Sequence, residues 1–104
     1  MKRFKVRFHA LAEDDLFKLY RDIAEHAGLG VAGAYVDRIE VACMALEIFP
    51  ERGTRRDDIR PGIRTVGFER RATIAFRVAE ANVEILRIFH GGQDYGPALR
   101  KTPL

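Results

Sequence analysis

The sequence predicts one α+β domain: an N-terminal strand, an antiparallel helical hairpin, and a three-strand antiparallel meander, with all strands in one sheet. Three observations predict it. Apolar and charged residues alternate at 5–9, apolar residues recur every third or fourth position between 10 and 49, and alternation returns in three runs between 63 and 90. The 104 residues are a common length for one domain with its own core. The predicted order is therefore β-α-α-β-β-β, in a single domain covering residues 1–104.

The composition indicates a folded, soluble chain. Hydrophobic residues make up 47% and charged residues 32%, which excludes disorder as a description of the whole chain. The single cysteine, Cys43, excludes an internal disulfide framework and fits a reducing compartment. No apolar run approaches the roughly 20 residues that span a bilayer, and the basic start of the chain lacks the apolar stretch of a signal peptide. We therefore expect a cytoplasmic protein that does not enter a membrane.

Charge is unevenly distributed along the chain. Residues 1–9 carry four basic and no acidic side chains, residues 10–50 three basic and eight acidic, and residues 51–104 eleven basic and seven acidic. Fourteen of the eighteen basic residues are arginine, whose planar head suits carboxylates and phosphates. An acidic protein segment or a nucleic acid is the expected partner, unless the arginine content only follows genome composition.

The first half of the chain predicts a strand and two helices. In the strand at residues 5–9, Val6 and Phe8 share one face, and His9 is expected to be a surface residue at its end. A helix begins at Ala10. Its acidic residues 13–15 lie in the first turns, where the helix dipole favours negative charge, and consecutive helical side chains do not converge on a metal. Residues 28–30 connect it to a second helix of about five turns, which Pro50 and Gly53 end. The apolar stripes are formed by Ala12, Leu16, Leu19, Tyr20, Ile23 and Ala27, and by Ala32, Tyr35, Ile39, Ala42, Leu46 and Phe49.

The second half predicts a polar loop at residues 51–60 and strands at 63–68, 72–78 and 83–90. A short connection at residues 79–82 fixes the register of the last two strands, so that Val78 opposes Val83 and Arg77 forms a cross-strand ion pair with Glu84. Residues 92–104 are turn-rich and are expected to form a tail.

The last strand is apolar on both faces, which is typical of a central strand. Its predicted faces are Val83, Ile85 and Phe89 on one side and Leu86 and Ile88 on the other. Arg87 would share the first face, where an unpaired guanidinium is costly. Two interpretations stay open: Arg87 pairs with a helix carboxylate, Asp15 or Asp22, or it is a functional arginine at the open end of the sheet.

Motifs for familiar catalytic chemistry are missing. The chain has no serine, no glycine-rich phosphate loop, and no histidine or cysteine spacing typical of a metal site, so we expect no metal and no cofactor. Metal-free RNA cleavage would need a base, an acid and cations around the phosphate. The side chains that could supply these groups are Arg64, Arg70, Arg71, Arg77, Arg87, His90 and Tyr95.

Five segments, in this order and spacing, resemble the ParE branch of the RelE/ParE toxin superfamily of bacterial type II toxin–antitoxin systems. They read AxxDL at 12–16, IFPERG at 48–53, PGIRT at 61–65, IAFRV at 74–78 and VEILRIFHG at 83–91. The resemblance covers residues 6–92 and implies a growth-arresting toxin held inactive by a cognate ParD-like antitoxin with a ribbon-helix-helix part. In ParE-like members the target is DNA gyrase; RelE-like members cut messenger RNA on the ribosome.

The resemblance favours a non-enzymatic gyrase inhibitor. Arg64 and Arg87 look like RelE-type arginines, but no lysine lies between Lys18 and Lys101, and Tyr95 is an uncertain match for the RelE tyrosine. If the chain were a ribonuclease instead, Arg64, Arg87 and His90 would be its catalytic residues. A third alternative is a non-toxic binding module. We expect no sequence-specific DNA binding by this chain alone. The predicted antitoxin- or target-binding residues are Phe17, Arg55, Arg56, Arg64, Arg71, Arg87, His90 and Tyr95.

Overall fold

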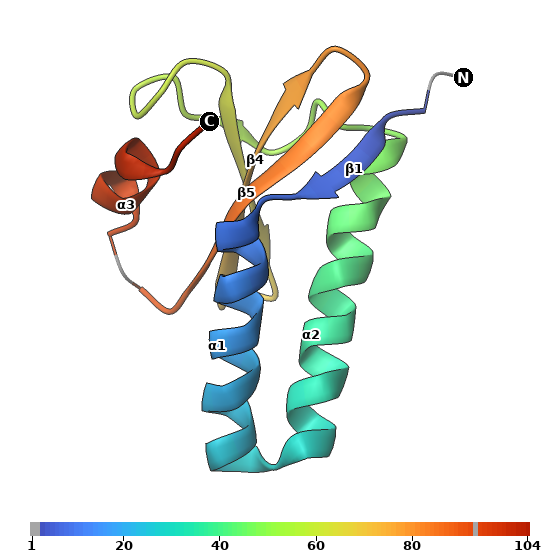
Figure 1. The fold of residues 1–104 in the computed structure, drawn as a ribbon, viewed down its shortest axis with the longest axis vertical. Coiled ribbons are helices and arrows are strands. Elements are labelled where there is room, and N and C mark those ends of the chain that lie inside the picture. The colour runs from blue at the N-terminus through green and yellow to red at the C-terminus, as the bar shows by residue number, and fades with distance from the viewer. Residues whose placement is uncertain (1–2, 93) are drawn as a thin grey trace.

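The computed structural model describes residues 3–92 and 94–104. A first strand leads into two long helices, and three longer strands follow (Figure 1). The elements are β1 (Lys5–Phe8), α1 (Ala10–Ala27), α2 (Leu29–Met44), the 3-10 helix η1 (Ala45–Glu47), β2 (Thr54–Arg55), β3 (Ile63–Phe68), β4 (Ala72–Ala79), β5 (Asn82–His90) and α3 (Gly96–Lys101). The predicted α+β class, the helical hairpin and the antiparallel β3–β4–β5 meander are confirmed.

The sheet is larger than the prediction. Among the described residues it has five strands in the order β1-β5-β4-β3-β2, and β1 pairs with β5 in parallel, so that the sheet is mixed rather than purely antiparallel. Strand β2 is only two residues long and lies in the predicted loop at 51–60, where no alternation could reveal it. Strand β1 lies alongside β5 and runs in the same direction, with Val6 opposite Val83. The predicted interior position of β5 is confirmed, since it lies between β1 and β4.

The helical hairpin covers one face of the sheet. The connection between α1 and α2 is the single residue Gly28 rather than the predicted 28–30; its φ of 95° suits glycine, and its N–H is donated to the Ala24 carbonyl. The core beneath the hairpin joins the helix stripes to the near face of β4 and β5. It is formed by Ala12, Leu16, Leu19, Tyr35, Ile39, Cys43, Leu46, Ala72, Ile74, Phe76, Val83, Ile85 and Ile88. The two predicted stripes hold except at their ends, where Ala27 and Phe49 are exposed.

The register of β4 and β5 is the predicted one: Val78 opposes Val83, and Arg77 is ion-paired with Glu84. Beyond this point a β-bulge matches Phe76 to Ile85 but Ala75 to Arg87, which leaves Leu86 without an opposite residue. The extra residue reverses the alternation in the second half of the strand. The predicted faces of β5 are therefore wrong there.

Across the bulge, Ile88 joins Val83 and Ile85 in the core beneath the hairpin, whereas Phe89 joins Leu86 on the other face of the sheet. The sequence does not mark the bulge, because the strand is apolar on both faces and adjacent apolar residues such as Ile85 and Leu86 fit a regular strand equally well. A strict period of two could not reveal it.

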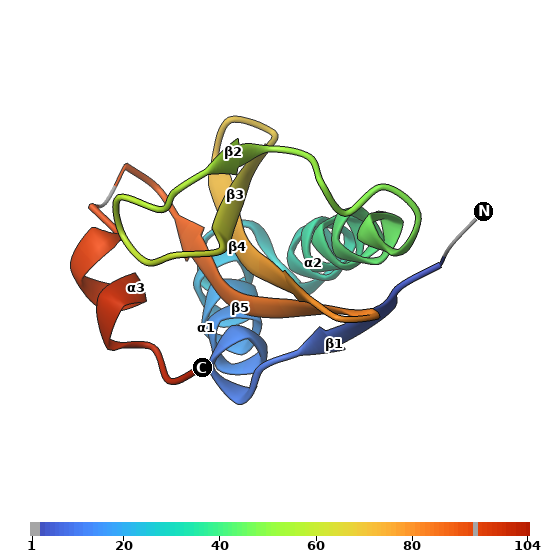
Figure 2. The same ribbon diagram turned by 90° about the horizontal axis from the view of Figure 1, so that it is seen from above.

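A second, smaller core covers the other face of the sheet. The predicted tail contains α3, which packs there on the side opposite α2 (Figure 2). Leu99 of α3 is fully buried, and Thr102 just after the helix is 1% exposed. This core consists of Ile59, Ile63, Ala75, Leu86, Phe89 and Leu99, with Tyr95 and Ala98 at its margin. The tail is therefore part of the domain.

Candidate functional site

Arg87 is bound within the fold by a carboxylate of α1. Its Nε and Nη2 donate to the two oxygens of Asp15 at 2.8 and 2.9 Å, and both side chains are largely buried, with 20% and 12% of their surfaces exposed. This bidentate hydrogen bond raises the pKa of Arg87. A further nitrogen lies 3.5 Å from the Thr102 hydroxyl. Of the two predicted interpretations, the pairing with Asp15 is correct, and Arg87 joins α1, β5 and the C-terminal tail.

Asp15 takes this position because β1 is short. Strand β1 ends at Phe8, opposite Ile85, and no strand of the described residues pairs with that edge of β5 beyond this point. Asp15 accepts a hydrogen bond from the Ile88 N–H at 2.9 Å and so satisfies a backbone donor on that edge.

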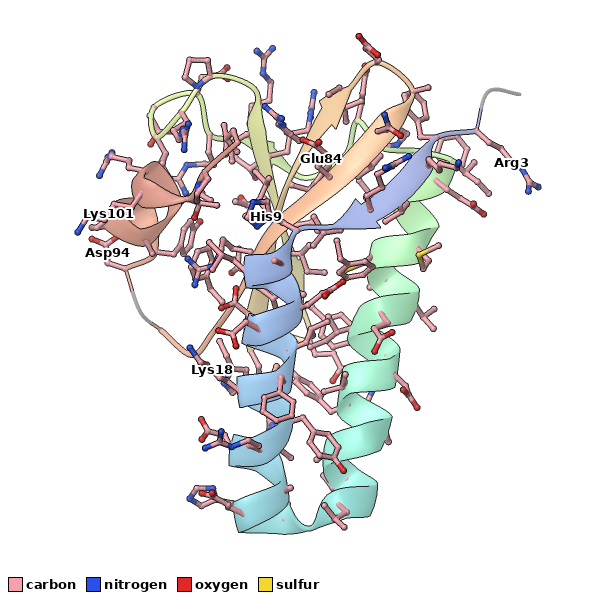
Figure 3. All side chains as sticks on the ribbon, viewed as in Figure 1. Arg3, His9, Lys18, Glu84, Asp94 and Lys101 are labelled. Atoms are coloured by element: carbon pink, nitrogen blue, oxygen red, sulfur yellow. The ribbon has the colours of Figure 1, made fainter. Side chains whose placement is uncertain are left out.

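His9 caps α1 by accepting the Leu11 N–H on its Nδ1 at 3.1 Å, and Figure 3 shows it at the junction of β1 and α1.

Arg56 and Tyr95 also have partners within the chain. Two nitrogens of Arg56 donate to Asp58 at 3.0 Å, and a third donates to the Tyr95 hydroxyl at 2.8 Å. The Tyr95 ring stacks on Phe89 with centroids 5.1 Å apart. The hydrogen bonds with Arg56 lower the pKa of Asp58 and raise that of Arg56. These contacts hold the loop before β3 to the start of α3.

Arg64 lies in a different part of the molecule, with its charge unmatched. It stands on β3 directly opposite Arg55 of β2, and like charges in that position repel. Arg55 is ion-paired with Asp57 at 2.9 Å, whereas no ion pair or side-chain hydrogen bond joins Arg64 to another described residue. Arg64 is half-buried in an open hollow. The hollow is lined by Glu51, Arg55, Gly62, Arg64 and Val78.

Arg71 and His90 lie at the opposite end of the strands from Arg64. They line a hollow between the hairpin and the turn that joins β3 to β4, in which Arg71 is exposed and has no carboxylate within ion-pairing distance among the described residues. The His90 ring lies edge-on to Tyr35, with centroids 6.0 Å apart. Phe17, on α1, is 57% exposed, and the Arg21 guanidinium lies over its ring.

The three candidate ribonuclease residues do not share one hollow. His90 and Arg87 line a polar hollow beside α1, but the Arg87 guanidinium there is occupied by Asp15. Arg64 lines a separate hollow near β2. The described residues contain no group of three or more His, Cys, Asp or Glu side chains placed to hold a metal ion. No described helix is long and apolar enough to cross a membrane.

Sequence reasoning missed three residues that complete the hollow of Arg71 and His90. Tyr35 was assigned to the core stripe, and it is indeed buried, but its hydroxyl has no hydrogen-bond partner among the described residues. Arg38 donates two hydrogen bonds to Glu69 at 2.8 and 3.2 Å, joining α2 to the β3–β4 turn. This pair is separated by 31 positions, so no local pattern could reveal it.

Comparisons with known proteins agree with this fold. Residues 6–95 match the model of the family described as the ParE toxin of type II toxin–antitoxin system, parDE. A curated relative, Toxin ParE3 of Caulobacter vibrioides, is 37% identical over 87 residues, which cover 84% of this chain and 86% of the relative. The chain belongs to the ParE toxin family of type II toxin–antitoxin systems.

Two solved structures have the same fold. One is the chromosomal ParDE toxin–antitoxin system from P. aeruginosa, with a TM-score of 0.77 and 26% identity over 86% of this chain and 98% of the other. The second is the toxin–antitoxin complex RelBE2 from Mycobacterium tuberculosis, with a TM-score of 0.57 and 24% identity over 85% of this chain and 98% of the other. The second likeness concerns the fold alone. The family match, the Caulobacter relative and the P. aeruginosa structure together confirm the resemblance to the RelE/ParE superfamily.

Proposed function

We propose that this toxin arrests growth by binding DNA gyrase without catalysis, and that a cognate ParD-like antitoxin neutralises it by forming a hetero-oligomer with it. Membership of the ParE family supports the gyrase target over messenger RNA. The same membership, with the ParDE title of the P. aeruginosa structure, supports a ribbon-helix-helix antitoxin as the partner.

Separation of the three candidate catalytic residues favours binding over catalysis. RNA cleavage needs cations, a base and an acid around one phosphate. Here the Arg87 guanidinium is bound by both oxygens of Asp15, and Arg64 lines another hollow. His90 shares its polar hollow with Arg87, Lys18 and Asp22, but Arg64, the second arginine of the candidate set, does not line that hollow. Such an arrangement suits a surface that holds a protein partner.

Arg64 and Arg55 are the proposed centre of the target-binding surface. Arg55 is paired with Asp57, and Glu51 lines the same hollow. The Arg64 guanidinium has no ion pair with a described residue and faces a like charge, so it is the group available to an incoming anion. Arg56 follows β2 directly, and its side chain is held by hydrogen bonds to Tyr95 and Asp58. We therefore assign Arg56 and Tyr95 a supporting role in this surface.

A supercoiling assay tests the target. Purified toxin is expected to inhibit gyrase supercoiling, and its induction in cells is expected to elicit the DNA-damage response before translation falls. Arg64→Ala should weaken inhibition about tenfold, since a charge-assisted contact is lost. Arg100→Ala, which also removes an exposed arginine, should change inhibition by less than about twofold.

A ribonuclease gives the opposite pattern. Cleaved transcripts within minutes of induction, with intact chromosomes and unimpaired supercoiling in vitro, would overturn the gyrase proposal. Survival of cells that express the chain without any antitoxin would instead favour the non-toxic binding module. Co-expression with the product of a short neighbouring reading frame for a ribbon-helix-helix protein is expected to restore growth.

A further inference from the structure

The connection between α2 and β2 presents an exposed aromatic side chain. Its sequence, IFPERG at residues 48–53, is one of the five segments that carry the family resemblance. Phe49 is 60% exposed, although the sequence places it at the end of an apolar helical stripe. Figure 2 shows this connection at the rim of the molecule, between the end of α2 and β2. A phenyl ring left in water forgoes the stabilisation that burial in the core would give it.

The backbone that carries Phe49 is fixed by its neighbours. Pro50, the next residue, is buried, and its ring fixes φ. Gly53 has a φ of 80°, and a Cβ there would lie 2.3 Å from the Thr65 carbonyl oxygen, so glycine is needed for this close approach to β3. Nε of Arg52 donates to the Phe49 carbonyl at 2.9 Å. The loop therefore holds the exposed ring at a defined place.

Arg52 orients the Phe49 ring without burying it. Its guanidinium carbon lies over the ring, 5.9 Å from the centroid. Its one hydrogen bond goes to a backbone carbonyl, and it forms no ion pair with a described residue. A cation over an exposed ring stabilises a fold only modestly. The contact thus positions a ring of which more than half remains accessible.

Phe49 lies beside the hollow that contains Arg64. Glu51 lines that hollow and follows Phe49 by two residues, a separation that spans at most about 7 Å. The Arg64 guanidinium has no ion pair with a described residue and is half-buried. Aromatic side chains and arginines are the residues that contribute most to protein interfaces. An accessible ring and an unmatched guanidinium therefore lie on neighbouring parts of one surface.

The helix that precedes the loop adds uncovered apolar surface. Val41 and Met44, three residues apart on α2, are 69% and 45% exposed. Residues at this spacing lie on the same side of a helix. On α1 the corresponding outward positions include the exposed ion pair of Asp14 and Lys18. Apolar groups without such charged neighbours are suited to contact with a protein.

We propose that Phe49 is the apolar anchor of the target-binding surface, and that it inserts into an apolar pocket of gyrase whose rim carries a carboxylate for Arg64. The identity of the target rests on the proposed function, whereas the anchor rests on the exposure and the fixed position of Phe49. A nucleic acid is a poorer partner, because Arg52 already covers one face of the ring on which a base would stack. The exposed Val41 and Met44 also offer nothing to a phosphate.

Purified gyrase and the full chain test the anchor. Phe49→Ala is expected to weaken gyrase binding and supercoiling inhibition at least about tenfold, as the loss of an aromatic anchor does. Its melting temperature should stay within about 3 °C of the wild-type value, because the side chain is mostly exposed in the free protein. Leu29→Ala is the matched control. It removes a 68% exposed side chain at the start of α2 and should change inhibition by less than about twofold.

Ionic strength separates the anchor from the arginine. Sodium chloride screens a contact between Arg64 and a carboxylate, but it does not screen the burial of a phenyl ring. The factor lost in Phe49→Ala should therefore stay constant as salt is raised, whereas the factor lost in Arg64→Ala should shrink. Phe49→Leu keeps most of the apolar volume and should inhibit within about threefold of the wild-type chain.

Equal inhibition by Phe49→Ala and the wild-type chain would overturn the anchor and leave the gyrase target in place. If the wild-type chain does not inhibit gyrase, the gyrase target falls, and growth arrest in cells decides the anchor. Phe49→Ala should then lose the arrest that Leu29→Ala retains, and equal arrest by both variants would overturn it. Loss of neutralisation by the antitoxin in Phe49→Ala, with supercoiling inhibition intact, would also overturn it. So would a single-stranded oligonucleotide that binds the wild-type chain and not Phe49→Ala.

Discussion

Arg87 lies at the junction of α1, β5 and the C-terminal tail, whereas Arg64 lies on β3 beside the two-residue strand β2. Both arginines follow an apolar residue in a strand that the sequence identifies clearly. Asp15 accepts two hydrogen bonds from Arg87 and also accepts the Ile88 N–H. Arg64 faces another arginine, and its side chain has no hydrogen-bond or ion-pair partner among the described residues.

This difference separates arginines that maintain the fold from arginines available to a partner. The Arg87 guanidinium donates two hydrogen bonds to one largely buried carboxylate, so it has little binding capacity left for a ligand. Moving it away would leave both the guanidinium and the carboxylate without a counter-charge. Arg64, half-buried and opposite another arginine, keeps its binding capacity because no ion pair or side-chain hydrogen bond with a described residue uses it. Arg77, paired with Glu84, belongs with Arg87, and Arg71 belongs with Arg64.

Removal of Asp15 is expected to have the largest effect. Asp15→Ala leaves the Arg87 guanidinium largely buried without a counter-charge and the Ile88 N–H without an acceptor, so the free energy of unfolding should fall by roughly 3–5 kcal/mol. Urea denaturation followed by circular dichroism measures it. Asp14→Ala is the matched control, since that neighbour pairs only with exposed Lys18 and should cost less than about 0.5 kcal/mol. Equal effects of the two changes would place Arg87 among the available arginines.

The two regions also differ in how far the sequence predicts them. Asp15 was one of two carboxylates named for Arg87, because an unpaired charge on an apolar strand needs a partner and α1 was expected to cover that strand. The hairpin connection at 79–82 fixed the Arg77–Glu84 pair by register alone. Pairing of this kind follows from alternation and turn length, which are properties of the local sequence.

Features that the sequence did not predict arise from contacts between distant segments. Strand β2 exists only because Thr54 and Arg55 meet β3, and a Cβ at Gly53 would collide with the Thr65 carbonyl there. Helix α3 gains its stability from burying Leu99 in the second core, not from its own six residues. The orphan hydroxyl of Tyr35 has no signature in a sequence at all.

Packing of α3 tests whether the tail supports the Arg87 region. Leu99→Ala removes a fully buried side chain from the second core and should lower the free energy of unfolding by roughly 2–4 kcal/mol. Because Thr102 approaches Arg87 at 3.5 Å, the change should also weaken the tail's attachment there. Hydrogen exchange is expected to rise in residues 96–101. Ala98→Gly, in the same short helix, provides a reference for the loss of helix propensity alone, about 1 kcal/mol. A Leu99→Ala effect no larger than that reference would show the tail to be dispensable.

Arg64 is expected to be nearly neutral for stability. Arg64→Ala relieves the repulsion with Arg55 and removes no ion pair, so the free energy of unfolding should change by no more than about 0.5 kcal/mol, in either direction. The same variant should lose most of its supercoiling inhibition. A large loss of stability would mean that Arg64, like Arg87, maintains the fold, and the comparison between the two regions would fail.

Acid titration should reveal the smallest difference, in the loop that joins the two regions. Hydrogen bonds from Arg56 lower the pKa of Asp58 in the folded state, so the carboxylate stabilises the fold above its ordinary value of 3.8. This contribution is lost as the pH falls from that value through the lowered folded pKa, because the unfolded state then takes up the proton first. In Asp58→Asn the loss of stability on acidification should be slightly smaller than in the wild-type chain. Asp37→Asn, an exposed carboxylate that forms no ion pair with a described residue, should leave the profile unchanged. Superimposable profiles for wild type and Asp58→Asn would show that Arg56, although paired, is held by Tyr95 rather than by Asp58, and would move it towards the arginines available to a partner.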